Sequence, residues 1–304
     1  MVARVPYDEF SMFHENAAEF GIRYLGPPTV SRQSVTTDDR RKISSLVWGN
    51  AQPEFVFLHG GAQNAHTWDT VLLALDRPAV AIDLPGHGHS DGPRSGHLNL
   101  RDNASDVAEV VRQLAPAAKV VVGMSLGGLT AIALADAEPD LVRALVLVDV
   151  TPGVDHGKAA AITAFVNGPE SFPDFDSLLA RTVEHNPTRS VSSLRRGILH
   201  NAEQLENGAW VWRYARHRAL EPDPGEGNPL DFAGLWDSVS RVAVPIMLVR
   251  GMRPQSVVDD ADEAELLRRA PSSRIEHVAE AGHSVQGDAP LELAQLVGEF
   301  AASV

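Results

Sequence analysis

Short apolar runs alternate with longer amphipathic segments along most of the chain. Runs rich in Val, Ile and Leu predict strands over residues 42–49, 54–60, 79–86, 119–125, 143–150, 245–251 and 273–282. Segments with the apolar spacing of helices lie between them, over residues 100–115, 126–139, 261–271 and 290–303. Several of the strands are almost continuously apolar, as strands covered on both faces are. The alternation predicts an α/β fold with a mostly parallel sheet flanked by crossover helices.

One long segment interrupts this alternation. Residues 151–242 show helical segments broken by Pro and Gly, and no convincing strand. An insertion of this length between two sheet strands predicts a helical cap over one edge of the sheet, and EPDPGEGNP at 221–229 predicts its exposed exit loop. The expected domains are a core of residues 1–150 and 243–304 and a cap of residues 151–242.

Composition limits the possible partners. The 304 residues include 40 Asp and Glu against 26 Lys and Arg, a net charge of −14, with no long basic run. This charge argues against binding to nucleic acid or to an anionic membrane and favours a small neutral or cationic ligand. The chain has no Cys, which excludes disulfides and thiolate metal sites, and no stretch with the pattern of a signal peptide or a spanning helix. We expect a soluble, cytoplasmic protein.

Ser125 lies between two glycines at the end of a predicted strand, in KVVVGMSLGG at 119–128. Reactive groups of open parallel sheets gather at the carboxyl ends of the strands. In a GxSxG turn, glycines such as Gly123 and Gly127 relieve crowding in a sharp strand-to-helix bend and expose the Ser hydroxyl. An ordinary glycine-rich turn with a capping Ser would share this pattern. In this context the pattern makes Ser125 a candidate nucleophile.

Two other stretches supply what a nucleophilic Ser needs. FVFLHGG at 55–61 ends a predicted strand, and the N–H of Gly61, with the N–H of Leu126 after the Ser, would stabilise an oxyanion. AEAGHS at 279–284 places His283 after the last predicted strand, and the ordinary pKa of His suits a general base at neutral pH. His66 and Trp68, which follow the glycines, are candidate substrate-binding residues that line the pocket or pack under the loop.

Four motifs together resemble the α/β-hydrolase superfamily: HGG at 59–61, DLPGHGHSDGP at 83–93, GMSLGG at 123–128 and GHS at 282–284. The resemblance covers nearly the whole chain from about Val30 onward, except the cap. It implies a central, mostly parallel eight-stranded sheet with a lid inserted after the sixth strand. It also implies a catalytic triad of Ser, acid and His in that chain order.

The resemblance implies a serine hydrolase that cleaves small or medium carboxylic esters through an acyl-enzyme, without metal or organic cofactor. Relatives that act on haloalkanes or epoxides have a carboxylate at the elbow position, so Ser125 argues against those activities. A lactonase, a thioesterase and a carbon–carbon bond hydrolase stay open on the same triad. A non-catalytic ligand-binding member of the fold is the alternative from a different class. The expected oligomeric state is a monomer or a dimer.

The acid of the triad has more than one candidate. Many relatives carry it in a Gly-x-x-Asp turn after the strand predicted at 245–251, where this chain has Pro254. Asp149, at the end of the strand predicted at 143–150, resembles the arrangement of members that take the acid from the sixth strand. Asp259 and Asp260 lie further along the loop, where capping of the following helix is the simpler role. We favour Asp149, and Asp259 or Asp260 remain alternatives.

Overall fold

The central feature is an eight-stranded sheet in the order β1-β2-β4-β3-β5-β6-β10-β11. The structure, a computed structural model, describes residues 4–154, 157–186, 188–214 and 232–304. The antiparallel neighbours are β1 with β2 and β2 with β4, and the other pairs are parallel. The strands are β1 (Val30–Thr36), β2 (Lys42–Trp48), β3 (Phe55–Leu58), β4 (Ala79–Ile82), β5 (Val120–Met124), β6 (Leu145–Val148), β10 (Ile246–Gly251) and β11 (Arg274–Val278). The predicted mostly parallel sheet is confirmed.

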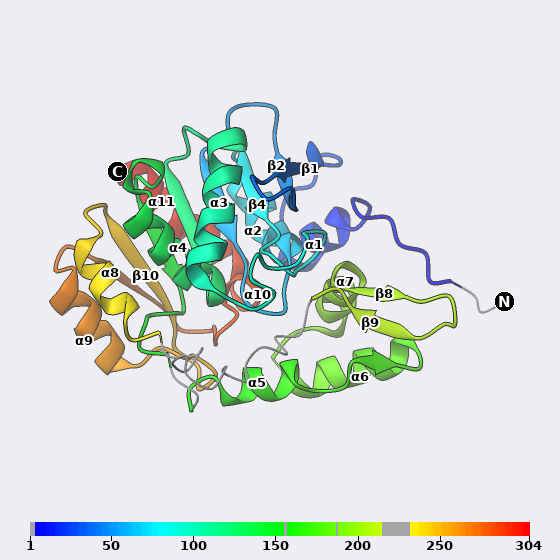
Figure 1. Cartoon of the computed structure of the whole chain (residues 1–304). Helices are drawn as coiled ribbons and strands as arrows, with labels where there is room; N and C mark the ends of the chain where they lie inside the picture. Colours follow the sequence, from blue (N-terminus) through cyan, green and yellow to red (C-terminus); the bar gives the residue numbers. More distant parts are fainter. Residues whose placement is uncertain (1–3, 155–156, 187, 215–231) are drawn as a thin grey trace.

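Helices cover both faces of this sheet (Figure 1). Alternate residues of each strand belong to different apolar layers: Val56 and Leu58 of β3 pack in one, Phe55 and Phe57 in the other. The first layer holds residues of α3 (Leu100–Leu114), α4 (Leu126–Ala137), α8 (Leu235–Arg241) and α9 (Asp260–Arg269). The second holds residues of α1 (Phe13–Phe20), α2 (Asp69–Leu75) and α11 (Pro290–Ser303). Because both faces are covered, the central strands are apolar at nearly every position.

The sequence pattern missed the first strand. β1 has the sequence VSRQSVT, and six of its seven side chains are exposed or half-buried. It lies at the edge of the sheet and pairs only with β2 among the described strands. An edge strand with one face in solvent has no continuous apolar run, which explains why apolar runs alone did not identify it.

Between β6 and α8 the described residues form a separate layer, which we call the cap. It contains α5 (Ala160–Val166), β7 (Ser171–Phe172), α6 (Phe175–His185), α7 (Val191–Asn201), β8 (Ala202–Gln204) and β9 (Trp210–Trp212). The three strands form a small antiparallel sheet, β7-β9-β8, so the expectation of a cap without strands was wrong. Strands of two or three residues are too short for a periodic pattern. The exit loop predicted at 221–229 lies outside the described residues.

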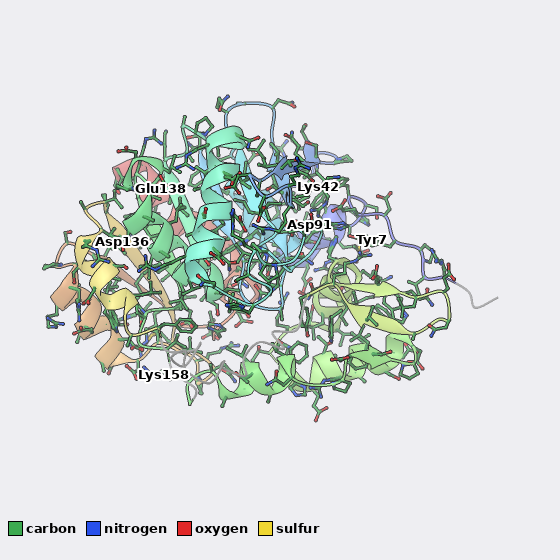
Figure 2. All side chains as sticks on the ribbon, viewed as in Figure 1. Tyr7, Lys42, Asp91, Asp136, Glu138 and Lys158 are labelled. Atoms are coloured by element: carbon green, nitrogen blue, oxygen red, sulfur yellow. The ribbon has the colours of Figure 1, made fainter. Side chains whose placement is uncertain are left out.

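The cap has its own apolar cluster, in which Phe172, Leu178 and Trp210 are buried. Residues of the N-terminal segment, including Tyr7 and Met12, pack against this cluster. In Figure 2 the labelled Tyr7 stands where the N-terminal segment meets the cap. The N-terminal segment therefore ties the cap to the core.

The helix α8 packs with the core, although the sequence prediction counted its residues in the insertion. Ser238 donates a hydrogen bond to Asp136 of α4 at 2.8 Å, and Arg241 forms an ion pair with the same carboxylate at 2.6 Å. Asp136 is labelled beside α8 in Figure 2. Within the described ranges, no helix is both long enough and apolar enough to cross a membrane.

Candidate active site

Ser125 occupies a strained turn between β5 and α4. Its backbone angles are φ 51° and ψ −120°, in a region that residues with a side chain rarely adopt. A Cβ added at Gly123 would come within 2.4 Å of the Gly127 carbonyl oxygen, and one at Gly127 within 2.2 Å of the Leu58 oxygen. The two glycines are therefore required by close backbone packing, as the GxSxG pattern predicted.

Asp149 and His283 meet at the carboxyl ends of the parallel strands. The Asp149 residue follows β6, has φ 47° and is fully buried. Its Oδ2 lies 2.9 Å from Nδ1 of His283 and accepts the N–H of Val257 at 3.0 Å, while Oδ1 accepts from Gly251 N at 2.9 Å and from Ser256 Oγ at 2.6 Å. Four donors therefore hold this carboxylate in a fixed orientation at the end of β6. With its Nδ1 proton directed to Asp149, His283 has Nε2 free to accept a proton.

The two alternative acids lie elsewhere. Asp259 caps α9, forms a capping box with Asp262 and an ion pair with Lys158 at 2.9 Å. Its side chain is half exposed, and the hydrogen bond from Lys158 lowers its pKa. Asp260 is almost fully exposed and pairs with Arg250 at 2.8 Å. Neither carboxylate forms a hydrogen bond with His283.

Ser125 and His283 line one cavity of about 490 Å³. Its walls come from the loop after β3, the turn at Ser125, the loop after β10 and the cap helix α5. No hydrogen bond joins Ser125 Oγ to His283 Nε2 in the structure, and neither atom bonds another described residue. Catalytic hydrogen bonds are often long without substrate and shorten in the complex. The structure therefore brings the candidate nucleophile and base to one cavity, with their bond unformed.

Two backbone N–H groups are available for an oxyanion. Gly61 lines the cavity with Ser125, and its N–H donates to no acceptor in the described part of the chain. Leu126 begins α4, where the first N–H groups of a helix have no acceptor within it. Gly60 lies close to the Ser: a Cβ added there would come within 3.2 Å of Ser125 Cβ. This close approach keeps the Gly61 backbone near the turn.

His59 supports the same loop without facing the cavity. Its Nδ1 donates to the carbonyl oxygen of Gly60 at 2.7 Å, and its Nε2 accepts the N–H of Leu84 at 2.9 Å. Burial lowers the pKa of His59, which favours the neutral ring that these two bonds require. His59 therefore bridges two loops, and it is absent from the residues that line the Ser125 cavity.

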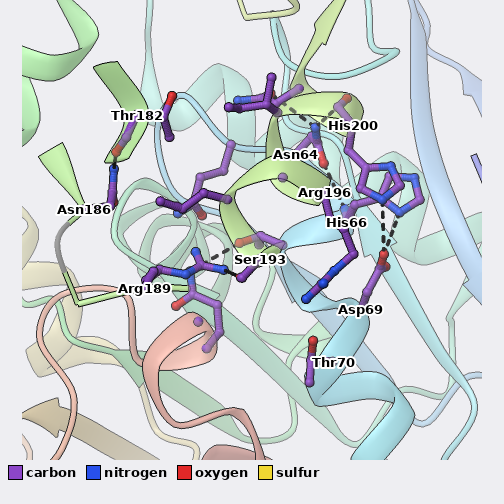
Figure 3. A pocket seen from close by; sticks show the side chains of 18 of the residues that line it. Asn64, His66, Asp69, Thr70, Thr182, Asn186, Arg189, Ser193, Arg196 and His200 are labelled. Carbon is purple, nitrogen blue, oxygen red and sulfur yellow. Dashed lines mark hydrogen bonds and ion pairs between the residues drawn. The ribbon is translucent and has the colours of Figure 1, made fainter. Parts of the chain in front are cut away.

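His66 and Trp68 do not line the Ser125 cavity. Trp68 is fully buried, with its ring centroid 5.0 Å from that of Phe57, which fits packing under the loop, one of the two roles expected for it. His66 lines a neighbouring cavity of about 170 Å³ between cap and core, where its ring stacks on His200 at 3.7 Å (Figure 3). Trp68 packs against Phe57 of β3 in the apolar core, where large aromatic side chains are often buried.

The described residues contain one cluster with the composition of a metal site: His66, Asp69 and His200. The two rings are stacked at an interplanar angle of 11°, whereas a metal ion binds in the plane of an imidazole. Both ring nitrogens of His66 already contact carboxylates, Asp69 at 2.9 Å and Glu9 at 3.0 Å. This arrangement fits a hydrogen-bonded joint between cap and core better than it fits an ion.

The motif analysis missed two residues at the site. Ser256 donates to Asp149 at 2.6 Å from the loop after β10, and Arg189 lines both cavities from the segment before α7. Neither belongs to a recognisable motif. A hydroxyl donor to the triad acid could have been sought in the loop that contains Ser256. The position of Arg189 depends on how the cap folds, which the sequence does not show.

A model of the alpha/beta hydrolase family matches residues 55–296. The chain belongs to this family. Esterase Rv0045c of Mycobacterium tuberculosis is 48% identical over 298 residues, which cover 95% of this chain and 94% of that protein. A solved structure of that esterase has a TM-score of 0.84 at 46% identity and covers 97% of this chain and 99% of its own. The 2-(acetamidomethylene)succinate hydrolase of Mesorhizobium japonicum is 29% identical over 78% of this chain and 84% of its own length.

These similarities confirm the resemblance and the fold class that the sequence indicated. The chain is an α/β hydrolase, and a relative that matches it over nearly its whole length is an esterase. The match covers the cap as well as the core, because it spans 95% of this chain.

Proposed function

We propose that this hydrolase cleaves small or medium carboxylic esters through an acyl-enzyme on Ser125. His283 removes the proton from Ser125 Oγ as the oxygen attacks the ester carbonyl and later returns it to the leaving alcohol. Asp149 orients His283 and stabilises its charged form. The N–H groups of Gly61 and Leu126 stabilise the oxyanion. Water then releases the acid, with His283 again acting as base.

The hydrogen bond between Asp149 Oδ2 and His283 Nδ1 carries this proposal. It joins an acid from the end of β6 to a His that shares a cavity with Ser125. An arrangement of acid, base and strained Ser argues against the non-catalytic alternative, because a binding protein would not need it. The cavity of about 490 Å³ suits a small or medium acyl group.

Ester hydrolysis by the wild type and by Ser125→Ala tests the proposal. We expect the wild type to hydrolyse 4-nitrophenyl butyrate and the variant to lose that activity with an unchanged melting temperature. Emulsified long-chain triglycerides should be hydrolysed poorly, since the cap residues close part of the cavity wall. Retention of most activity in Ser125→Ala would exclude an acyl-enzyme on this residue.

The compartment and the oligomeric state remain proposals drawn from the sequence. We propose a cytoplasmic enzyme, supported by a chain without Cys, which suits a reducing compartment. We propose a monomer or a dimer with a small-molecule ester as its substrate. Cell fractionation and the mass of the purified protein by light scattering test these two points.

A further inference from the structure

Arg189 stands where the Ser125 cavity meets the neighbouring cavity. The two cavities share four of their lining residues: Gln63, Phe165, Asn186 and Arg189. Arg189 reaches the core, since a Cβ added at Gly287 of α10 would come within 2.7 Å of its Nη1. Figure 3 shows its side chain beside Ser193 on the cavity wall. A ligand that extends beyond Ser125 into the second cavity therefore passes this guanidinium.

The guanidinium of Arg189 has no carboxylate partner in the described ranges. Its Nη2 donates to the hydroxyl of Ser193, while Nε is buried without a hydrogen bond. Asp288 and Glu19 attract it from a distance, but neither forms an ion pair with it. Glu19 pairs with Arg196, and Asp288 accepts the N–H of Gly282 at 2.9 Å.

Several other arginines of this protein form ion pairs with carboxylates. Arg32 pairs with Asp83 at 2.7 Å, Arg41 with Asp106 at 2.7 Å and Arg250 with Glu263 at 2.8 Å. A charged group withdrawn from water is costly unless it is paired. Burial accordingly lowers the pKa of Arg189, whereas the pKa of Arg32 is raised because the attraction of Asp83 and Glu9 outweighs burial. Arg189 is therefore a buried cation without the anionic partner that would offset the cost of its burial.

We propose that Arg189 binds a carboxylate of the substrate, so that the enzyme prefers esters bearing a second, negatively charged carboxyl group. A planar guanidinium offers a fork of N–H donors that matches a carboxylate. Nη1 forms no hydrogen bond with a described residue, so its N–H groups are available to the carboxylate, and the bond from Nη2 to Ser193 holds the guanidinium in place. Lys158, the other Lys or Arg on the Ser125 cavity, is already neutralised by Asp259 and Asp262. This inference rests on the proposed function and names its substrate class.

The inference differs from the expectation drawn from net charge, which favoured neutral or cationic ligands. A net charge of −14 describes the whole surface. A substrate in the cavity is affected most by the nearest charges, because distant surface charges are screened by salt. Arg189 therefore decides the preference locally.

Matched esters test the inference in the wild type. One pair is 4-nitrophenyl hydrogen adipate against 4-nitrophenyl methyl adipate, with the charge on the acyl side. The other is 4-carboxyphenyl hexanoate against its methyl ester, with the charge on the alcohol side. We expect kcat/KM to favour the charged member of at least one pair by about 10- to 100-fold, the range of a charge-assisted hydrogen bond. Equal rates in both pairs, or preference for the neutral members, would overturn the proposal.

Variants then assign the preference to Arg189. Arg189→Met should abolish it through a rise in KM for the charged ester that exceeds any change for the neutral ester, and Arg189→Lys should retain part of it. The control is Arg253→Met, which removes an equal charge from a residue that pairs with Glu280 and does not line the Ser125 cavity. A preference that survives in Arg189→Met, or that Arg253→Met removes equally, would contradict the assignment.

The wild-type comparison keeps the test valid even if Arg189→Met fails to fold. Failure of the proposed function gives a different result: neither ester is hydrolysed, or Ser125→Ala hydrolyses both. Failure of the inference alone leaves hydrolysis that depends on Ser125 but ignores the charge.

Discussion

The strand ends of the core and the joint between cap and core are held in different ways. At the strand ends, backbone packing fixes the geometry: a Cβ added at Gly127 would meet the Leu58 carbonyl, and Asp149 accepts four hydrogen bonds, two of them from backbone N–H groups. At the joint between cap and core, hydrogen bonds donated by side chains hold the two parts together. Asn64 donates to the His200 carbonyl at 3.0 Å, and Asn201 donates to the carbonyl of Ala62.

This difference separates chemistry from selectivity. A site fixed by backbone contacts keeps its geometry when surrounding side chains change, as an attacking group requires. A joint of polar side chains can change with each substitution, and the cavity it lines changes with it. We therefore expect the core strand ends to set the rate of the reaction and the cap to set which esters react.

The largest expected effect comes from the core acid. Asp149→Asn keeps the shape of the side chain but removes the charge that orients His283, so kcat should fall by up to about 10⁴-fold, as it does in a triad whose Asp is neutralised. Steady-state kinetics on 4-nitrophenyl butyrate measure this change. A near wild-type kcat would show that Asp149 is not the triad acid.

The next effect compares a glycine of the core with one of the cap. Gly127→Ala should destabilise the protein by about 3 kcal/mol or more, because the new methyl group meets backbone. Gly197 lies within α7 with nothing within 4 Å of an added Cβ, so Gly197→Ala should stabilise the protein by about 0.5–1 kcal/mol through helix propensity. Chemical denaturation measures both. Equal changes in the free energy of unfolding for Gly127→Ala and Gly197→Ala would contradict the proposed difference between backbone packing in the core and looser packing in the cap.

The joint should also respond to pH through His66. Burial alone would lower its pKa, but the attraction of the Asp69 charge and the hydrogen bonds that His66 donates to Asp69 and Glu9 raise the pKa of His66 from 6.5 to about 9. The charged ring therefore stabilises the folded state fully below pH 6.5, and this contribution is lost as the pH rises through about 9. His66→Gln should cost on the order of 2–3 kcal/mol at pH 6 and much less at pH 10.

Melting temperatures of wild type and His66→Gln across this pH range check the effect. His97→Gln serves as the control, because the His97 ring makes no hydrogen bond in the part of the chain that the structure describes. A constant difference in stability between wild type and His66→Gln from pH 6 to pH 10 would rule out a charged His66 at the joint.

The smallest effect concerns Asp259, an alternative candidate for the triad acid. Asp259 caps α9, so Asp259→Asn should leave kcat unchanged and lower stability by at most about 1 kcal/mol, since Asn also caps helices. Kinetics and denaturation of this one variant separate capping from catalysis. A collapse of kcat would move the acid from the end of β6 to the loop after β10.

The core was readable from the sequence because its constraints are local. The strands β3 to β6 are apolar runs, β10 is mostly apolar, and the turn at Ser125 is marked in the sequence by Gly123 and Gly127. Asp149 could be favoured because a strand end has a known place in a parallel sheet. Its rivals, Asp259 and Asp260, were ranked lower for a role that the structure gives Asp259, helix capping.

The cap was less readable because its contacts join distant parts of the chain. His200 meets His66 and Tyr7, residues far from it in sequence, and no periodic pattern links them. The sequence left two roles open for Trp68, because an aromatic residue after a glycine loop can face either a cavity or the core. Arg189 could be recognised as a candidate binding residue only from the structure, which shows that it lacks the ion pairs that arginines such as Arg32 and Arg41 form.

Labelling with a fluorophosphonate probe tests the central claim most directly, since such probes react with an activated Ser and stop the reaction at the covalent step. We predict one adduct per chain, located by peptide mass spectrometry on Ser125. Labelling should be absent in Ser125→Ala and much slower in Asp149→Asn, and Arg253→Met should label at the wild-type rate. No adduct, or an adduct on another residue, would contradict the assignment of the chemistry to the strand ends of the core.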